Sequence, residues 1–491
     1  MRIESADSAA NPSYKTAWWT PRLAGPLIAA AGLRLALLAI AIARPQTGAL
    51  SHADTSSFLI PGRNLLLHGS FIADGVPDLM RTPGYPLFIA ITSLAGLHAA
   101  ALANVILSVF SVFLVWKLGR TVFEDDRIAL VAAWIFAFEP GTVSGSFVLI
   151  SDILALTLYL LSLERLAVFL HTRRLPVLAV AGLWLAAATF VRPVTYYLPV
   201  ALALGLFIVF ARVPGLPPQR HRPVAGDPGL RWKAPAVLLI SVLPWLAAWQ
   251  VRNWVETGYS GFSSVKEIDL YIWDAADVTA RVEHRPFSEV SREFGIIDYT
   301  NTSGQLYLSQ TYLAQHPEQA GWNQAQRIAF MHSEAVRIIR AHFGVYLRSC
   351  IAPLFKTAFY PGVYYFDRSL HPIHRALAAE FDYAGMPRWQ SALAKAIADP
   401  LYAAQLVAFE VALLAVYLFA ARGVFLAARG VFRGSLHNEC LWLLLGTSLY
   451  FLAVVGAAEG PGATPRYRLP VMPAVCILAA AGVRRAKPIV R

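Results

Sequence analysis

The chain has 491 residues, of which 57% are hydrophobic and 15% are charged, and its Lys and Arg residues outnumber Asp and Glu by 42 to 30. Because an average soluble domain carries about 25% charged residues, this composition excludes a disordered chain and almost any ordinary cytosolic enzyme. It indicates a polytopic membrane protein. The three cysteines are too few and too scattered for a disulfide framework or a cysteine-rich zinc site.

Apolar stretches long enough to cross about 30 Å of hydrocarbon occur in both halves of the chain. They predict an all-α polytopic membrane protein with about ten transmembrane helices. The expected helices lie at residues 23–43, 99–118, 128–141, 148–170, 176–190, 194–211, 234–251, 401–424, 439–457 and 467–484. A shorter apolar run at 83–97 fits either a further crossing or a helix at the lipid surface.

Loop charge predicts how these helices are oriented. When the run 83–97 is not counted as a crossing, twenty Lys and Arg residues fall in the short segments on one side of the membrane and six on the other. Cytoplasmic loops are the ones enriched in Lys and Arg, so both termini are expected in the cytoplasm. The formal charge of +12 follows from this bias, and no nucleic-acid partner is expected. The basic linker 213–233 is then a cytoplasmic loop.

The same orientation divides the chain into three parts. Residues 1–251 are expected to form an N-terminal transmembrane module whose first extracytoplasmic loop is 44–82, and residues 401–491 the C-terminal transmembrane helices. Residues 252–400 are less apolar and are expected to form a partly helical extracytoplasmic domain. Within it, apolar residues at helical spacing over 324–354 predict an amphipathic helix that returns to the membrane surface.

The first extracytoplasmic loop contains the most informative candidate residue. Asp54 follows the first helix in a short polar cluster, and the block RTPGYP from Arg81 to Pro86 leads the chain back towards the bilayer. An aspartate at the membrane surface is able to act as a general base on the hydroxyl group of an acceptor. An aspartate in this position is also a common solvated helix cap. The residue type alone therefore leaves both interpretations open.

Five blocks of sequence, in chain order, resemble a known family. They are Asp54 with Gly69-Ser70-Phe71 and RTPGYPLFIA from Arg81, Glu139-Pro140 with Ser151-Asp152, Val191-Arg192-Pro193, Pro244-Trp245 with Arg252-Asn253, and Arg466-Tyr467-Arg468-Leu469-Pro470. Together they resemble the GT-C superfamily of membrane glycosyltransferases. The similar branch includes the dolichyl-phosphate-mannose protein mannosyltransferases and the bacterial aminoarabinose transferases that act on lipid A. The resemblance covers the membrane part well and residues 260–400 poorly.

The resemblance implies an inverting glycosyltransferase that moves a single sugar from a polyprenyl-phosphate donor. In a bacterium the donor lipid would be undecaprenyl phosphate, and the periplasmic acceptor would be lipid A, a polysaccharide or a protein. Asp54 is implied as the catalytic residue. Many relatives carry a glutamate where this chain has Asp152. Glu139 is expected near the same face, and pairing with a nearby arginine explains it equally well. Asp152 is equally well explained as a first-turn carboxylate that the helix dipole favours.

Further contacts to the substrate are expected from Tyr85 and Tyr467, and arginines on the outer side are expected to hold the donor phosphate. A phosphate at the membrane surface needs cationic, bidentate partners, and a charge at bilayer depth is costly unless it is paired or functional. The candidates are Arg81, Arg192, Arg252, Arg466 and Arg468. Anchoring to lipid phosphates explains the same arginines. The last two are the strongest candidates, because flanking prolines predict a short ordered turn.

Signals for other chemistry are weak. The twelve histidines show no HExxH motif and no clustered metal spacing, so no dedicated metal site is predicted. A divalent cation would require Asp54, Asp152 and Glu139 to converge. The sequence contains no Walker loop and no GxSxG motif, which argues against ATP hydrolysis and a serine-hydrolase mechanism.

Two other classes of function fit a membrane protein with these charges. One is a transporter or flippase of lipid-linked sugars, although the paired repeats common in transporters are not evident. The other is a noncatalytic assembly subunit. The Ala- and Arg-rich composition and the absence of an expected disulfide favour a bacterial inner membrane, with the site facing the periplasm.

Overall fold

The computed structural model describes residues 20–52, 54–211, 229–295, 314, 316–360, 397, 400–429, 435–458, 460 and 464–484. Its α-helices are α1 (Ala24–Ala43), α2 (Thr55–His68), α3 (Gly84–Thr92), α4 (Leu97–Phe123), α5 (Asp126–Ala137), α6 (Pro140–Gly145), α7 (Asp152–Thr172), α8 (Leu175–Val191), α9 (Leu198–Ala211), α10 (Leu230–Thr257), α11 (Val265–Asp269), α12 (Ala276–Val282), α13 (Phe287–Glu293), α15 (Gln324–Ala341), α16 (Phe343–Ser349), α17 (Ile351–Phe359), α21 (Pro400–Ala428), α22 (Ser435–Ala458) and α23 (Met472–Val483). Two short strands, β1 (Ile72–Ala73) and β2 (Val76–Pro77), pair antiparallel in the first loop.

Shorter helical turns connect these elements. A π-helical turn, η5 (Leu270–Ala275), joins α11 to α12, and a 3-10 helix, η8 (Pro465–Arg468), precedes α23. Because flanking prolines fix the backbone and cannot continue a preceding helix, the predicted span 467–484 begins as the η8 turn and becomes α-helical only at Met472. This irregular turn matters because it holds two of the candidate arginines.

The expected all-α polytopic membrane fold is confirmed. Seven of the described helices are long and apolar enough to cross a membrane, and three shorter apolar helices, Gly84–Ala95, Leu175–Val191 and Met472–Val483, lie among them. The run at 83–97 forms α3 and a following 3-10 turn. At 1.5 Å per residue, the nine residues of α3 span only about 14 Å, so α3 is too short to cross about 30 Å of hydrocarbon by itself.

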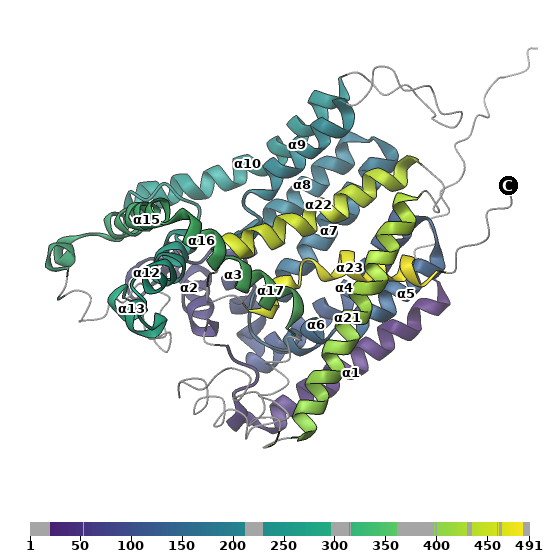
Figure 1. The fold of residues 1–491 in the computed structure, drawn as a ribbon, viewed down its shortest axis with the longest axis horizontal. Helices are drawn as coiled ribbons and strands as arrows, with labels where there is room; N and C mark the ends of the chain where they lie inside the picture. Colours follow the sequence, from purple (N-terminus) through teal and green to yellow (C-terminus); the bar gives the residue numbers. More distant parts are fainter. Residues whose placement is uncertain are drawn as a thin grey trace, which may run out of the picture.

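Most of the long helices contribute to one large apolar core. In the centre of the bundle α7 packs against α4 and α8, while α23 packs against α5 and α21 (Figure 1). The crossing of α21 and α23 is very close: a Cβ atom added at Gly482 would lie 1.9 Å from the carbonyl oxygen of Phe419. Helix interfaces in membranes favour small residues for this reason, since contact between backbones increases packing.

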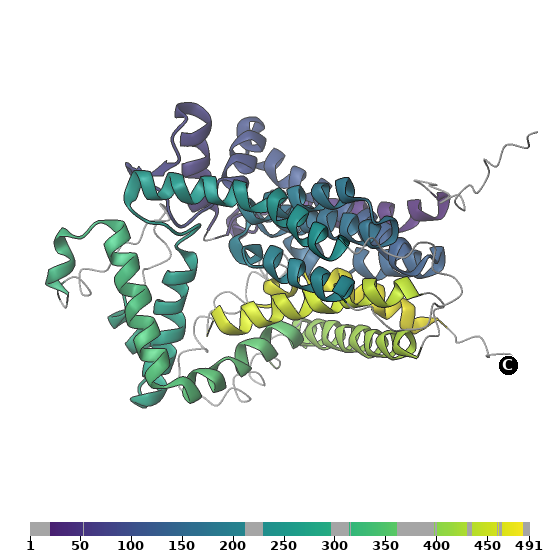
Figure 2. The same cartoon turned by 90° about the horizontal axis from the view of Figure 1, so that it is seen from above.

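Most of the described part of the region 252–400 is helical. Its helices α11, α12, α13, α15 and α16 gather at one end of the bundle, across the direction of the long helices (Figures 1 and 2). The single amphipathic helix expected over 324–354 is divided into α15, α16 and α17. Helix α15 buries Ile328, Met331 and Ile339. Its inner face packs against η5, rather than on lipid, because Met331 shares a core with Tyr271 and Ile272.

Candidate active site

The first loop is folded back onto the bundle, and this fixes Asp54. The backbone N–H of His52 donates to the Thr55 hydroxyl (2.8 Å), which donates to the carbonyl of Leu149 (2.9 Å) in the loop before α7. Helix α2 then lies against α3, where a Cβ atom on Gly62 would come within 2.0 Å of the Pro86 carbonyl oxygen. Only glycine allows this approach. Two segments separated in sequence by about a hundred residues therefore hold the candidate base.

Asp54 occupies the N-cap position of α2, but its side chain makes no capping hydrogen bond. Instead, Oδ1 lies 3.0 Å from Nη2 of Arg81, and Oδ2 lies 3.6 Å from Nη2 of Arg466. The Nδ1 atom of His52 lies 3.2 Å from the same Oδ2. Only 14% of the carboxylate side chain is exposed. The solvated-cap interpretation therefore does not describe Asp54.

The charge of this carboxylate is set by its neighbours. Burial raises the pKa of Asp54, but the Arg81 guanidinium, the His52 hydrogen bond and the Arg466 guanidinium together hold that pKa well below its usual range. Burial also lowers the pKa of His52, despite the adjacent carboxylate. At neutral pH the cluster therefore contains one carboxylate, one neutral imidazole and two guanidinium groups.

The two arginines have different supports. Arg81 donates from Nε to the Ser57 hydroxyl (2.9 Å), and its guanidinium lies 4.4 Å from the centre of the Phe58 ring. Arg466 comes from η8, at the other end of the chain, and donates to the Tyr467 hydroxyl (3.3 Å). Its guanidinium carbon also lies 5.1 Å from the Tyr467 ring centre. Cation–aromatic contacts of this kind orient a guanidinium while leaving its outer N–H groups available for a ligand.

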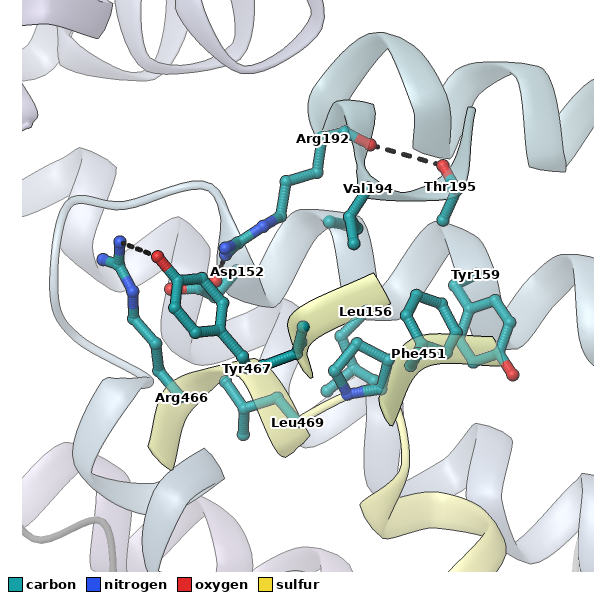
Figure 3. Close-up of a pocket in the computed structure, with 13 residues that line it drawn as sticks. Asp152, Leu156, Tyr159, Arg192, Val194, Thr195, Phe451, Arg466, Tyr467 and Leu469 are labelled. Carbon is teal, nitrogen blue, oxygen red and sulfur yellow. Dashed lines mark hydrogen bonds and ion pairs between the residues drawn. The ribbon is translucent and has the colours of Figure 1, made fainter. Parts of the chain in front are cut away.

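A narrow pocket opens beside this cluster (Figure 3). Arg192, which follows α8, forms an ion pair with Asp152 at the start of α7, and its guanidinium carbon lies 5.2 Å from the Tyr467 ring centre. The polar mouth of the pocket therefore holds Arg192 and Arg466 on either side of Tyr467. Its deeper wall is apolar, and is formed in part by Leu156, Tyr159, Phe451, Val455 and Leu469.

The structure thus brings together six of the predicted site residues and leaves four elsewhere. Asp54, Arg81, Arg192, Arg466, Tyr467 and Asp152 surround the cluster and the pocket. The four others are Tyr85, Arg252, Glu139 and Arg468. Each has contacts that explain it without a substrate.

Tyr85 and Arg252 stabilise the first loop. Tyr85 is fully buried, packs edge-on against Phe58 at 5.0 Å between ring centres, and receives the Asn104 amide at 3.5 Å. The guanidinium of Arg252 donates to the carbonyl of Phe71 (2.9 Å) and pairs with Glu256 at 2.7 Å. Neither position matches the expectation of a substrate or phosphate ligand.

Arg468 and Glu139 form a buried pair away from the pocket. Arg468 is 2% exposed, and one guanidinium nitrogen donates to the carbonyls of Thr357 (3.4 Å), Ala358 (3.3 Å) and Tyr360 at the end of α17. A second nitrogen lies 3.9 Å from Glu139. The expectation that Arg468 joins Arg466 at a donor phosphate is therefore not retained. Oε2 of Glu139 caps α6 by accepting the backbone N–H of Thr142 (2.6 Å).

A second buried carboxylate supports the loop. Asp78 is 3% exposed, and its Oδ1 accepts the backbone N–H groups of Met80 (2.8 Å) and Arg81 (2.9 Å). Burial raises the pKa of Asp78 to about 6, although these hydrogen bonds and the nearby charges of Arg81 and Arg252 oppose the shift. Asp78 thus fixes the backbone that presents Arg81 to Asp54.

Sequence reasoning did not single out His52, Ser57 and Asp78. The available signal was spacing. His52 is only two residues before Asp54, and Ser57 is three residues after it, one helical turn away when a helix begins at Thr55. Asp78 gave no such signal, because in the sequence it resembles any polar loop residue.

The carboxylates of this site do not form a set of ligands that suits a metal ion. Within the described ranges, no three His, Cys, Asp or Glu side chains gather at one point. Asp54, Asp152 and Glu139, the three carboxylates considered for a divalent cation, each face an arginine instead. Guanidinium groups at these distances repel a cation.

Residues 81–216 match the family model described as dolichyl-phosphate-mannose-protein mannosyltransferase. The resemblance to the GT-C superfamily is confirmed. The matched segment contains Arg81, Asp152 and Arg192, whereas Asp54 and Arg466 lie outside it. No curated protein matches the chain.

Several solved GT-C structures are similar at low identity. One is the oligosaccharyltransferase of Archaeoglobus fulgidus in the apo form, at 12% identity over 95% of this chain and 51% of that one, with a TM-score of 0.46. Another is ArnT from Cupriavidus metallidurans bound to undecaprenyl phosphate, at 14% identity over 89% and 77%, with a TM-score of 0.35. The chain spans about half the length of the archaeal oligosaccharyltransferase.

Proposed function

We propose that this chain is an integral membrane glycosyltransferase that transfers one sugar from a polyprenyl-phosphate donor to a hydroxyl acceptor. The observation behind the proposal is the position of Asp54 between Arg81 and Arg466, beside a pocket with a cationic mouth and an apolar wall. The GT-C match over residues 81–216 supports the same class of reaction. We place the protein in a bacterial inner membrane, with undecaprenyl phosphate as donor lipid and the site facing the periplasm.

The lining of the pocket favours one orientation of the donor. Its phosphate would pair with Arg466 and Arg192 at the mouth, with Arg81 on the Asp54 side, because guanidinium groups match phosphate oxygens bidentately. Its first isoprene units would lie along the wall formed by Leu156 and Phe451. In this orientation the apolar lipid meets apolar side chains and the charged head group meets guanidinium groups.

Asp54 would act as general base. The acceptor oxygen attacks the anomeric carbon of the sugar as its proton passes to the Asp54 carboxylate, and the bond between that carbon and the phosphate oxygen breaks. The electron pair of this bond leaves with the polyprenyl phosphate, whose negative charge increases. A single displacement of this kind inverts the anomeric centre. Arginines already held in place stabilise the additional charge in the transition state.

Donor binding would also activate the base. In the donor-free arrangement, Arg81 and Arg466 pair with Asp54 and keep its pKa low, so the carboxylate is a weak proton acceptor. A donor phosphate competes for the same guanidinium groups. As these charges turn to the phosphate, the pKa of Asp54 rises towards its ordinary value, and proton transfer becomes more favourable. The donor therefore has to be bound before the acceptor is deprotonated.

The experiment is sugar transfer by the purified protein in lipid nanodiscs. A panel of radiolabelled undecaprenyl-phosphate sugars is offered together with lipid A, periplasmic polysaccharide and protein acceptors, and the release of undecaprenyl phosphate is measured. A transferase releases the lipid only when an acceptor is present. A flippase moves the intact donor between leaflets and releases nothing, and this result would refute the proposal. A mass shift in envelope glycans after deletion of the gene identifies the acceptor.

A further inference from the structure

Residues Asp78–Arg81 connect the proposed base to the extracytoplasmic helices, and we call them the coupling segment. At the end of this segment, Nη2 of Arg81 lies 3.0 Å from Oδ1 of Asp54. At its beginning, the Asp78 carboxylate accepts the backbone N–H groups of Met80 (2.8 Å) and Arg81 (2.9 Å), so the four residues form one turn. A displacement of this turn therefore displaces Arg81.

The backbone of the coupling segment is held by the end of α10 and by the residues that follow that helix. Three consecutive carbonyl groups of the segment each accept a hydrogen bond from this region. The donors are Nη1 of Arg252 to Asp78 (3.4 Å), the backbone N–H of Ser264 to Leu79 (2.8 Å) and the hydroxyl of Ser263 to Met80 (2.7 Å). Because a buried carbonyl group without a partner is costly, the segment follows the position of this region.

Two apolar side chains of the segment enter the cores of the extracytoplasmic helices. Leu79 is 4% exposed and packs with Tyr259 and with Ile328 of α15. Met80 packs against the cluster that contains Met331 of the same helix. Close-packed interiors leave little room for independent movement. A shift of α15 is therefore transmitted to the turn that carries Arg81.

We propose that Leu79 is a positioning residue for sugar transfer: its contact with Ile328 makes the placement of Arg81 beside Asp54 depend on the packing of α15. The catalytic consequence rests on the glycosyltransferase function proposed above, in which Arg81 contributes to binding of the donor phosphate. Neither Leu79 nor Ile328 lines the donor pocket. An effect of either side chain on the donor therefore has to pass through the coupling segment.

Four substitutions and one control test this coupling. Leu79→Ala and Ile328→Ala remove the two sides of one contact, and Leu79→Met keeps the side-chain volume and should behave like the parent. Ser263→Ala removes the hydrogen bond to Met80 without truncating an apolar core. Ile339→Ala is the matched control, because Ile339 is also buried on α15 but belongs to neither of the two apolar clusters that receive the segment.

The first readout is kinetic, in lipid nanodiscs. We expect Leu79→Ala and Ile328→Ala each to raise donor KM and the dissociation constant of undecaprenyl phosphate about five- to tenfold. The double variant should show little more than the larger single effect, since the two substitutions remove the same contact. Ser263→Ala should raise both constants about two- to fivefold. A merely structural role would reduce the amount of folded protein, and this lowers kcat and leaves donor KM unchanged.

Hydrogen exchange provides a second readout that does not require activity. The N–H groups of Met80 and Arg81 are hydrogen-bonded to Asp78, so Ile328→Ala should accelerate their exchange, whereas Ile339→Ala should leave it at the parental rate. Thermal unfolding in detergent checks that each variant is folded. Should Leu79→Ala unfold, Ser263→Ala and Ile328→Ala still decide the question.

The outcomes separate the coupling from the proposed function. Parental donor KM and exchange in the folded variants, or an equal rise of donor KM in Ile339→Ala, would overturn the role of Leu79. A parent protein that transfers no sugar would instead refute the proposed function. In that case hydrogen exchange and the affinity for undecaprenyl phosphate still decide whether α15 is coupled to Arg81.

Discussion

Replacement of Asp54 by asparagine tests the proposed chemistry directly. The variant keeps an oxygen that accepts the hydrogen bond from Arg81 (3.0 Å) but removes the negative charge and the ability to take a proton. We expect kcat to fall by roughly 10²–10⁴, the usual contribution of general acid–base catalysis. Because the carboxylate is only 14% exposed and faces two guanidinium groups, we also expect a loss of about 1–2 kcal/mol in unfolding free energy, between the values for exposed and buried ion pairs.

Donor binding should change in the opposite direction. A phosphate held by Arg81 and Arg466 would lie about 6 Å from the Asp54 carboxylate, and at an effective dielectric constant of about 20 two such charges repel by roughly 3 kcal/mol. Solvent at the pocket mouth reduces this value, so we expect Asp54→Asn to bind undecaprenyl phosphate about five- to fiftyfold more tightly. Loss of turnover with a gain in donor affinity distinguishes a missing base from a damaged site.

The assay combines steady-state transfer with titration of undecaprenyl phosphate by isothermal calorimetry in detergent. Asp74→Asn is the matched control, because Asp74 is exposed in the same loop and its φ of 48° suits asparagine. Asp78 is not a suitable control, since it is buried and hydrogen-bonded. Parental kcat in Asp54→Asn would refute the role of base, and weaker donor binding would refute the competition between carboxylate and phosphate.

Three more outcomes can be measured, two that depend on contacts in the structure and one that depends on the charge of the loops. Arg466→Ala should raise donor KM about tenfold or more, and Arg466→Lys should restore donor KM in part. Arg468→Ala should instead lower the melting temperature, because it leaves Glu139 buried without its cation. Equal effects of the two alanine variants on donor KM would contradict this difference between the two arginines. Asp78 should contribute stability that is lost as the pH rises from about 4 to about 6, since its raised pKa means that the folded state binds the proton more tightly than the unfolded state, and thermal unfolding of Asp78→Asn should lack this contribution. A reporter fused at Gly226 should be cytoplasmic and one at Gly304 periplasmic, two positions outside the described residues; the same side for both would refute the orientation.

Much of the architecture follows from apolar length alone. A run such as 99–118 has to bury its backbone polar groups in a helix when it is surrounded by lipid, and α4 covers it. The run 467–484 shows the limit of this reasoning. Its hydropathy does not reveal that the first residues form the η8 turn, because that boundary depends on two prolines and on the partners of two arginines.

The candidate site was predictable in part. Residue type and expected membrane side assigned Asp54, Arg81 and Arg466 to one site, and the structure places the three side chains together. The same reasoning did not distinguish Arg466 from Arg468. The two differ in what each meets across the fold: one side of the turn faces the pocket and the other faces the end of α17. Such long-range contacts leave no local pattern in the sequence.

The η8 turn has a consequence for engineering chimeras of this protein. Because Arg468 holds the last carbonyls of α17 and Arg466, two residues earlier, meets Asp54 and His52, the end of α17 and the pocket share one rigid segment. A graft of residues 252–400 from a relative would bring a foreign α17 against the resident turn. We expect such a graft to lose activity, and to regain it when the turn from Thr464 to Pro470 is transplanted together with α17. The natural unit of exchange is therefore discontinuous in sequence.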